Sequence, residues 1–196
     1  PAPPRAAGHA VEAPCKPLAA QAQAHGLAAC GLRVEGAQHL GIEPHQACQS
    51  LATFANVKRR MELRGDVRGV KVYDDFAHHP TAIRLTLDGL RRKVGAARIV
   101  AVFEPRSSTM KLGAMKAQLP WALEEADMSY CFAGNLVWDA SQALAPLAAQ
   151  ARVVTQLDDL VREVVAGSRP GDHVLVMSNG GFGGIHDKLL RRLAAR

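Results

Sequence analysis

Two carboxylates and two imidazoles lie close together near the middle of the chain. Asp74 and Asp75 end a β-favouring segment, and His78 and His79 directly precede Pro80. Proline suits the first turn of a helix and holds the residue before it in an extended conformation. Titratable groups between the end of a strand and the start of a helix are typical of a ligand site in an open α/β sheet. An acidic turn with two solvent-exposed histidines would have the same sequence.

A second group of polar residues follows the apolar run RIVAVF, residues 98–103. The segment EPRSSTMK contains Arg106, Ser107 and Lys111. A guanidinium group offers a planar pair of donors to a carboxylate or phosphate, and a lysine adds a second positive charge. We therefore expect an anionic ligand here, with a solvated surface loop as the alternative.

Ser178 and Asn179 begin a third group, the glycine-rich segment SNGGFGG before the last predicted helix. Backbone N–H groups at a helix start can receive an anion, but glycines equally permit a tight turn with close helix–strand packing. Both interpretations are open at this point. The glycine spacing does not fit a dinucleotide fingerprint, and the chain contains no G-x-x-x-x-G-K-[ST] phosphate loop.

The hydrophobic pattern predicts the elements that position these groups. Short apolar or β-branched runs predict strands at residues 61–64, 67–73, 98–103, 128–133, 152–154 and 173–177. Apolar residues at helical spacing predict helices at residues 24–40, 44–51, 83–94, 111–126, 157–165 and 185–193. Their alternation predicts an α/β fold with a mostly parallel, doubly wound, Rossmann-like sheet, preceded by a short helical remnant of another domain.

Three local details of this prediction depend on single residues. Gly65 and Asp66 are expected to form the turn between the first two strands. Pro120 is expected to kink or interrupt the helix 111–126, and Thr155 to cap the helix that follows it. Because parallel strands end at one edge of a sheet, the three polar groups are expected to converge on a single cleft.

Composition narrows the class of protein. The chain is 48% hydrophobic and 21% charged, as in ordinary globular proteins. It contains no apolar run near the roughly 18 residues of a membrane span and begins with no secretory signal, so we expect a cytoplasmic protein without a membrane partner. The net charge of +6 is scattered among few aromatic residues. That distribution argues against nucleic acid and suits a basic pocket for a small anionic molecule.

The four cysteines include no C-x-x-C pair and no zinc-like spacing. We expect free thiols, with Cys48 and Cys131 acting as small hydrophobic residues. The first 20 residues are rich in proline and alanine and are expected to form a flexible tail or the edge of a preceding domain.

Taken together, the segments VYDDFAHHPTAI, FEPRSSTMKLG and MSNGGFGGIH resemble the C-terminal domain of the Mur ligase family. The segment NVKRRMELRG is similar to the linker between the central and C-terminal domains of that family. The resemblance extends over about residues 25–196. It implies that residues 1–57 are a tail and the helical end of the ATP-binding central domain. Residues 58–196 would then be the C-terminal, peptide-binding domain of a longer chain.

The resemblance also implies an activity. In this family, ATP and Mg²⁺ convert the carboxylate of a muramyl nucleotide into an acyl phosphate, and an incoming amino group displaces the phosphate. The motifs are most similar to members that join the tripeptide L-Ala-γ-D-Glu-meso-diaminopimelate to UDP-N-acetylmuramate in peptidoglycan recycling. The alternatives are a member that adds L-alanine to the same nucleotide and a non-catalytic α/β module for an anionic ligand.

Residue by residue, the resemblance assigns ATP contacts to Arg60, Asp75 and His78. It assigns contacts with the peptide to Arg106, Ser107, Lys111, Ser178 and Asn179. It implies no catalytic residue and no metal ligand within this chain, because ATP and Mg²⁺ would be bound mainly by the N-terminal and central domains. One departure concerns the nucleotide, since His25 fits the family's His-Asn-x-x-Asn pattern but Gly26 and Ala29 replace its asparagines.

Overall fold

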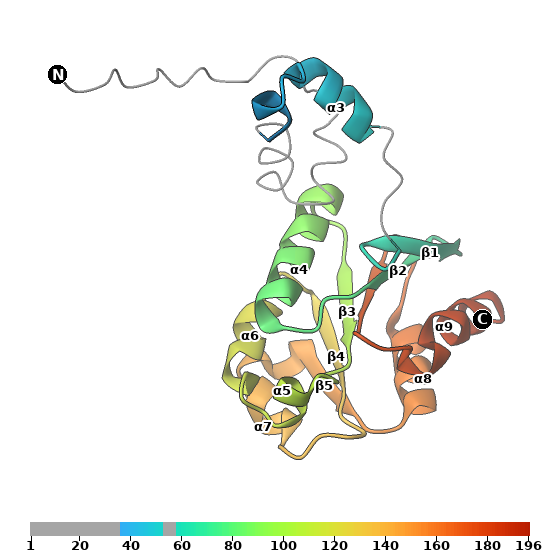
Figure 1. The fold of residues 1–196 in the computed structure, drawn as a ribbon. Helices are drawn as coiled ribbons and strands as arrows, with labels where there is room; N and C mark the ends of the chain where they lie inside the picture. Colours follow the sequence, from blue (N-terminus) through green and yellow to red (C-terminus); the bar gives the residue numbers. More distant parts are fainter. Residues whose placement is uncertain (1–35, 53–57) are drawn as a thin grey trace. The chain divides into compact units, whose positions relative to one another are not determined.

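The computed structural model describes residues 36–52 and 58–196, and the chain divides into two compact units, residues 1–55 and 56–196 (Figure 1). In the first unit, helix α3 (Pro44–Ala52) begins at the proline, as predicted. Residues 36–39 are helical, and Gly41 has a φ of +76°, which suits its expected position after a helix end. The tail, Gly26, Ala29 and most of the predicted helix 24–40 lie outside the described residues.

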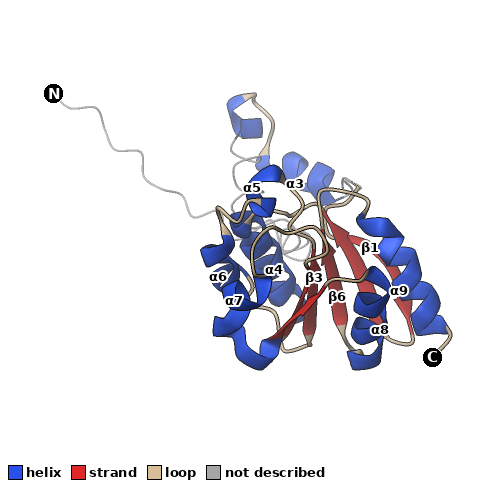
Figure 2. Cartoon of the chain, turned by 90° about the horizontal axis from the view of Figure 1, so that it is seen from below, coloured by secondary structure: helices blue, strands red, loops and turns tan. Residues whose placement is uncertain are grey.

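The second unit contains one sheet with six strands, which are β1 (Glu62–Val67), β2 (Val70–Asp75), β3 (Ile99–Phe103), β4 (Met128–Phe132), β5 (Ala151–Val154) and β6 (His173–Met177). Their order is β1-β2-β6-β3-β4-β5 (Figure 2). Every neighbouring pair is parallel except β1 and β2, which are antiparallel. The predicted fold class is therefore confirmed, and the strand order, which the sequence did not indicate, places β6 between β2 and β3.

Helices cover both faces of this sheet. One face packs against α4 (Pro80–Val94), α6 (Leu119–Ala122) and α7 (Ala140–Leu144). The other face packs against α8 (Leu157–Gly167) and α9 (Ile185–Ala194). The shorter helical segments are α5 (Ser108–Lys111), η1 (Lys116–Gln118), η2 (Ala145–Gln150) and η3 (Phe182–Gly184). No helix among the described residues has the length and apolar content needed to cross a bilayer.

The alternation of side chains along β3 shows why the sheet is buried on both faces. Ile99, Ala101 and Phe103 belong to the core beneath α4 and α6, whereas Val100 and Val102 belong to the core beneath α8 and α9. Successive side chains of a strand point to opposite faces, so a continuous apolar run contributes to two cores. This is the pattern from which the sequence predicted a buried parallel strand.

The start of α4 follows the local prediction closely. His79 is the N-cap residue in an extended conformation (φ −108°, ψ 145°), as the proline after it requires. Its Nδ1 accepts a hydrogen bond from the backbone N–H of Thr81 at 3.4 Å. Cys131 in β4 is fully buried, and burial raises the pKa of its thiol to about 12, which confirms its role as a small hydrophobic residue.

The first hairpin turns at a different place from the one predicted. Its turn residues are Arg68 and Gly69, both with positive φ (53° and 77°), between the paired Val67 and Val70. Two positive φ values define a type I′ turn, whose twist matches that of the strands. Gly65 instead lies within β1 after a register shift, so the prediction of a turn at Gly65 and Asp66 was wrong.

Two further local predictions need correction. The predicted helix 111–126 is interrupted at Pro120, as expected, because the proline occupies the first turn of α6. Its first part is not one helix either, since Gly113 adopts a φ of +75° and α5 and η1 replace it. The cap of α8 is Gln156, which makes no side-chain capping bond, rather than Thr155. Asp158 does lie in the first turn of α8, where a carboxylate is favoured.

Candidate functional site

The loops after β2, β3 and β6 meet at the carboxyl edge of the sheet. The backbone N–H of Ser178 donates to the carbonyl of Asp75 at 3.1 Å, and the N–H of Glu104 donates to the carbonyl of Met177 at 3.1 Å. These two bonds continue the pairing of three adjacent strands into their loops. The expected convergence of the three polar groups is therefore present, with the glycine-rich loop in the middle.

Ser178 organises this middle loop. Its side chain is buried, and its hydroxyl donates to Oε2 of Glu104 at 2.7 Å. Oγ of Ser178 also accepts from the N–H of Gly180 at 3.0 Å. Both roles of the hydroxyl are therefore satisfied within the protein. The neighbouring Asn179 differs, because its buried Oδ1 has no hydrogen-bond partner among the described residues.

The loop after β3 presents Arg106 at the surface. Its guanidinium group lies against Gly180, where a Cβ atom would fall 2.6 Å from the Cζ of the arginine. Ser107 is the N-cap of α5, and its Oγ accepts from the N–H of Met110 at 3.4 Å. Lys111 ends this short helix and is partly exposed. Arg106 and Lys111 thus bring positive charge to this edge, whereas Ser107 has a structural role.

Asp75 is nearly buried, and its oxygens accept bonds from the protein backbone. Oδ2 accepts from the N–H of Met61 and Oδ1 from the N–H of Ala77, both at 2.8 Å. Burial raises the pKa of Asp75, although these two bonds and the charge of Arg60 partly oppose the rise. The carboxylate therefore holds the segment before β1 against the end of β2.

The adjacent Asp74 is also buried but faces positive charge. Its oxygens lie 3.4 Å from Nε of Arg59, 3.5 Å from Nη1 of Arg64 and 3.4 Å from Nε2 of His186. Burial alone would raise the pKa of Asp74, but His186 and Arg59 outweigh it, and the pKa is lowered. Two neighbouring carboxylates thus shift in opposite directions, because consecutive residues of a strand face different surroundings.

The ring of Phe76, directly after β2, contacts two guanidinium groups and an imidazole ring. The guanidinium groups of Arg59 and Arg60 lie over its ring at 5.3 and 5.7 Å from the centroid. The ring of His78 meets it edge-on at 5.3 Å, and Nδ1 of His78 lies 2.9 Å from the carbonyl of Phe76. Since a carbonyl can only accept, this nitrogen of His78 carries the proton. Arg60 and His78, both predicted nucleotide contacts, therefore share one exposed aromatic platform.

Arg59 is the site residue that the sequence analysis missed. Its Nη2 donates to the carbonyls of Ser178 and Gly180 at 2.6 and 2.8 Å. Its φ of +59° is rare for a residue other than glycine, and such strain is concentrated at functional positions. Two consecutive arginines beside a strand offered no sign of which one bonds to the glycine-rich loop.

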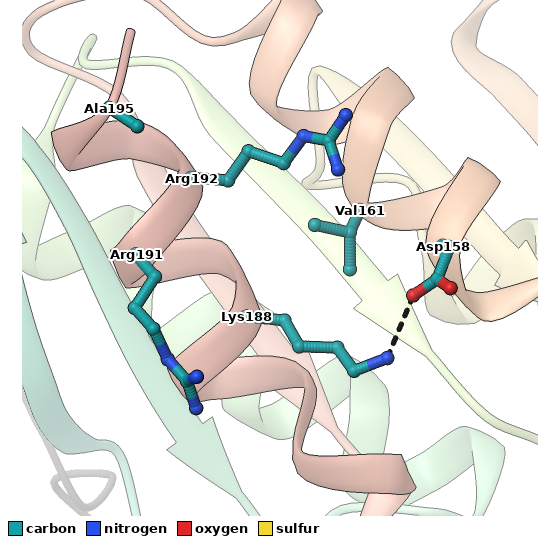
Figure 3. A pocket seen from close by; sticks show the side chains of 6 residues that line it. All are labelled: Asp158, Val161, Lys188, Arg191, Arg192 and Ala195. Carbon is teal, nitrogen blue, oxygen red and sulfur yellow. Dashed lines mark hydrogen bonds and ion pairs between the residues drawn. The ribbon is translucent and has the colours of Figure 1, made fainter.

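A separate hollow of about 430 Å³ lies between α8 and α9, lined by Asp158, Val161, Lys188, Arg191, Arg192 and Ala195 (Figure 3). Nζ of Lys188 is paired with Asp158 at 2.7 Å. Arg191 and Arg192 extend to different sides of α9, so their charges do not converge. None of the predicted site residues lines this hollow, and we place the candidate site at the loops instead.

Metal binding by this part of the chain finds little support in its donor set. Among the described residues, no group of three histidine, cysteine or acidic side chains gathers in a way that could hold a metal ion. Asp75 is 3% exposed, and its oxygens already accept backbone bonds. The carboxyl edge therefore does not fit Mg²⁺ bound directly by its own carboxylates.

Comparison with known proteins assigns most of the second unit to one protein family. Residues 59–180 match the family described as Mur ligase, glutamate ligase domain. The chain belongs to the Mur ligase family. The resemblance inferred from the three motifs is thereby confirmed, and the matched range includes the first two loops of the carboxyl edge and the start of the glycine-rich loop.

The similar proteins include tripeptide ligases and UDP-N-acetylmuramate–L-alanine ligases. The chain is 48% identical over 84% of its length to the UDP-N-acetylmuramate–L-alanyl-gamma-D-glutamyl-meso-2,6-diaminoheptandioate ligase of Escherichia coli K12. A solved structure described as a domain from such a ligase of Haemophilus ducreyi has a TM-score of 0.61 and 47% identity, and covers 69% of this chain and 100% of that one. The murein peptide ligase of Psychrobacter arcticus has a TM-score of 0.66 and 38% identity, and covers 83% of this chain and 35% of that one.

The chain is much shorter than the full-length ligases that it matches. The chain spans 36% of the length of the Escherichia coli ligase. The Haemophilus ducreyi domain, by contrast, is covered over its whole length. The matching residues therefore correspond to one part of a larger ligase.

Proposed function

We propose that this chain is the C-terminal part of an ATP-dependent ligase that joins the tripeptide L-Ala-γ-D-Glu-meso-diaminopimelate to UDP-N-acetylmuramate in peptidoglycan recycling. The observation that carries the proposal is the meeting of the Arg106 loop with the glycine-rich loop, in a chain 48% identical to a ligase of that name. The boundary near residue 57 separates the end of the ATP-binding domain from the peptide-binding domain in this proposal.

The peptide side of the site rests on charge. The tripeptide carries several carboxylates, and a guanidinium group binds a carboxylate through two parallel hydrogen bonds. Arg106 supplies this fork, Lys111 adds a second positive charge, and Asn179 has a buried amide oxygen with no hydrogen-bond partner among the described residues. Ser107 and Ser178 act through the loops they hold, since their hydroxyls bond within the protein.

The nucleotide side rests on the segment before β1. The guanidinium group of the exposed Arg60 lies over the ring of Phe76, and His78 meets the same ring edge-on, so both have access to a phosphate or base from one surface. Asp75 serves the nucleotide indirectly, because its carboxylate holds the N–H of Met61 and thereby the residue before it. Most contacts with ATP, Mg²⁺ and UDP-N-acetylmuramate come from the N-terminal and central domains, which carry the phosphate loop.

The chemistry is divided accordingly. ATP supplies the phosphoryl group that turns the muramyl carboxylate into an acyl phosphate, and this chain supplies the residues that bind and orient the attacking peptide. Holding the amino group near the activated carbonyl replaces a bimolecular encounter with a positioned one. Closure of the domain over the acyl phosphate excludes water, which limits hydrolysis.

The test uses the full-length ligase with Arg106→Ala. We expect KM for the tripeptide to rise about tenfold or more, with KM for ATP little changed, because one charge-assisted contact is lost on the peptide side only. Arg162→Ala, an exposed arginine on α8 paired with Asp159, is the matched control and should leave both constants unchanged. Equal increases in both KM values would remove Arg106 from the peptide site.

Acceptor choice separates the remaining possibilities. Parallel assays with L-alanine and with tripeptide distinguish the two ligase classes, because only the accepted substrate releases phosphate. If neither acceptor is used by the full-length protein while this chain alone binds tripeptide in a calorimeter, the non-catalytic module is the better description.

A further inference from the structure

Arg59 connects the segment before β1 to the loop after β6. One guanidinium nitrogen donates to the carbonyls of Ser178 and Gly180, while Nε lies 3.4 Å from the buried Asp74. The carbonyl of Arg59 itself accepts from the N–H of Phe76 at 2.9 Å. The residue thus bonds to two segments, residues 74–76 and 178–180, that are far apart in the sequence.

Gly180 lies between two arginines. Its carbonyl accepts from Arg59, and its Cα faces the guanidinium group of Arg106 so closely that any Cβ would collide with it. The colliding atoms are the far end of a flexible side chain, and Gly180 does not adopt a positive φ. An alanine at this position would therefore displace Arg106 while leaving the backbone unstrained.

Arg106 is held by packing and keeps its donors available. Among the described residues its guanidinium group donates to no protein acceptor and pairs with no carboxylate, although its face lies against Gly180. A long, exposed side chain normally loses conformational freedom when it binds a ligand, and preorganisation reduces that loss. Packing against Gly180, which has no side chain, orients the guanidinium group of Arg106 and leaves its N–H donors free for a ligand.

We propose that Arg59 and Gly180 are positioning residues for the peptide substrate: Arg59 fixes the Gly180 carbonyl, and Gly180 seats the guanidinium group of Arg106. The role given to Arg106 rests on the proposed function. The arrangement couples the two substrates, because Arg59 directly precedes the predicted nucleotide contact Arg60. Movement of this segment changes the hold on Gly180 and hence the orientation of the peptide-binding arginine.

The structural test needs no activity and uses the chain of 196 residues. NMR of the Arg106 Nε–H group should show a shifted and broadened signal in Gly180→Ala and in Arg59→Ala. In the first variant the new methyl group displaces the guanidinium group, and in the second the Gly180 carbonyl loses the bond that fixes it. Arg64→Ala is the matched control, since Arg64 also pairs with Asp74 but has no bond to the glycine-rich loop. An Arg106 signal unchanged in both test variants, or changed equally in the control, would overturn the proposal.

The functional test uses the full-length ligase. Gly180→Ala and Arg59→Ala should each raise KM for the tripeptide about five- to tenfold, with a smaller change in KM for ATP. Neither should add a further effect in an Arg106→Ala background, because residues that act as a unit are not additive. Arg59→Lys should restore part of the loss through its charge, but not all, because an ammonium lacks the planar fork.

The outcomes separate the two proposals. If Arg106→Ala alone leaves the tripeptide KM unchanged, the proposed peptide site fails, while the NMR signal still decides whether Arg59 and Gly180 orient Arg106. Additive effects in the double variants, in proteins whose thermal unfolding is unchanged, would show that the positioning role is wrong even if Arg106 binds the peptide.

Discussion

The two edges of the sheet use the same residue types in opposite ways. At the amino edge, Nη1 of Arg98 lies 2.8 Å from Oδ2 of Asp172, whose side chain is 1% exposed. Nη2 of Arg91 lies 2.6 Å from Oδ2 of Asp127, and that oxygen also accepts from the N–H of Ile99 at 2.7 Å. Both of these arginines have a carboxylate partner, and the pairs join strand ends to neighbouring loops.

At the carboxyl edge the arginines are held mainly by backbone and packing. Arg59 donates to two carbonyls, Arg60 stacks over Phe76, and Arg106 lies against Gly180. Arg59 also pairs with Asp74, whereas Arg106 has no carboxylate partner among the described residues, so its positive charge stays available to an anion. The two edges therefore differ in how their arginines are held rather than in the number of charges.

The largest expected effect lies at the amino edge. Asp172→Asn should lower the free energy of unfolding by about 3 kcal/mol, because breaking a buried pair leaves Arg98 without its partner. Urea denaturation measures it. Asp66→Asn, the same change in an exposed pair with Lys71, should cost less than about 0.5 kcal/mol.

Arg106→Ala at the carboxyl edge should also change stability by less than about 0.5 kcal/mol, since the side chain is exposed and makes no ion pair with the described residues. A large loss of stability here, or none in Asp172→Asn, would remove the distinction between the two edges.

The pH dependence should differ between two adjacent carboxylates. The pKa of Asp74 is lowered in the folded state, so its contribution to stability is present above its unfolded pKa and is lost as pH falls through the folded value. The pKa of Asp75 is raised, so its ionisation opposes folding, and stability is gained as pH falls through its folded value.

Replacing each residue by asparagine should therefore change how the free energy of unfolding depends on acidic pH, in opposite directions for the two variants. Between about pH 3 and 7, Asp74→Asn should flatten the loss of stability toward acid, and Asp75→Asn should steepen it. Urea midpoints across this range provide the measurement, with the unchanged chain as reference. Identical slopes in the two variants would contradict the assigned surroundings.

A small stabilising effect is expected at the hairpin turn at the amino edge. Arg68 has a φ of +53° in a type I′ turn, a conformation that asparagine adopts more readily. Arg68→Asn should raise the free energy of unfolding by about 0.5 to 1 kcal/mol, as replacement of a strained turn residue does elsewhere. Thermal unfolding detects it, and KM for both substrates of the full-length ligase should be unchanged. A stabilised variant with altered KM values would show that the two edges are not independent.

Local rules predicted much of the chain, and they failed where distant contacts decide. Pro80 determined both the start of α4 and the extended conformation of His79. The helix 111–126 failed because Gly113 ends α5 against Trp138, whose Nε1 donates to the carbonyl of Met110 at 2.8 Å. A tryptophan so far along the chain leaves no periodic signal near residue 113.

The glycine-rich loop shows the same division. Sequence left anion binding and tight packing open, and the structure assigns different roles to individual glycines. A Cβ on Gly183 would lie 2.5 Å from Cδ2 of Leu157, so this glycine permits close packing of α9 against α8. Gly180 instead makes room for Arg106, which no glycine spacing indicates.

The sequence by itself determined the α/β class and the family, because periodicity, proline and short motifs act through near neighbours. It also determined five elements next to the three loops, namely β2, α4, β3, β6 and α9. Only the tertiary structure decided that β6 lies between β2 and β3, that Asp74 and Asp75 have opposite surroundings, and that Arg59 holds Gly180. The place of β6, the contact of Asp74 with His186 and the bond from Arg59 to Gly180 join distant parts of the chain, which come together only when the whole sheet has formed.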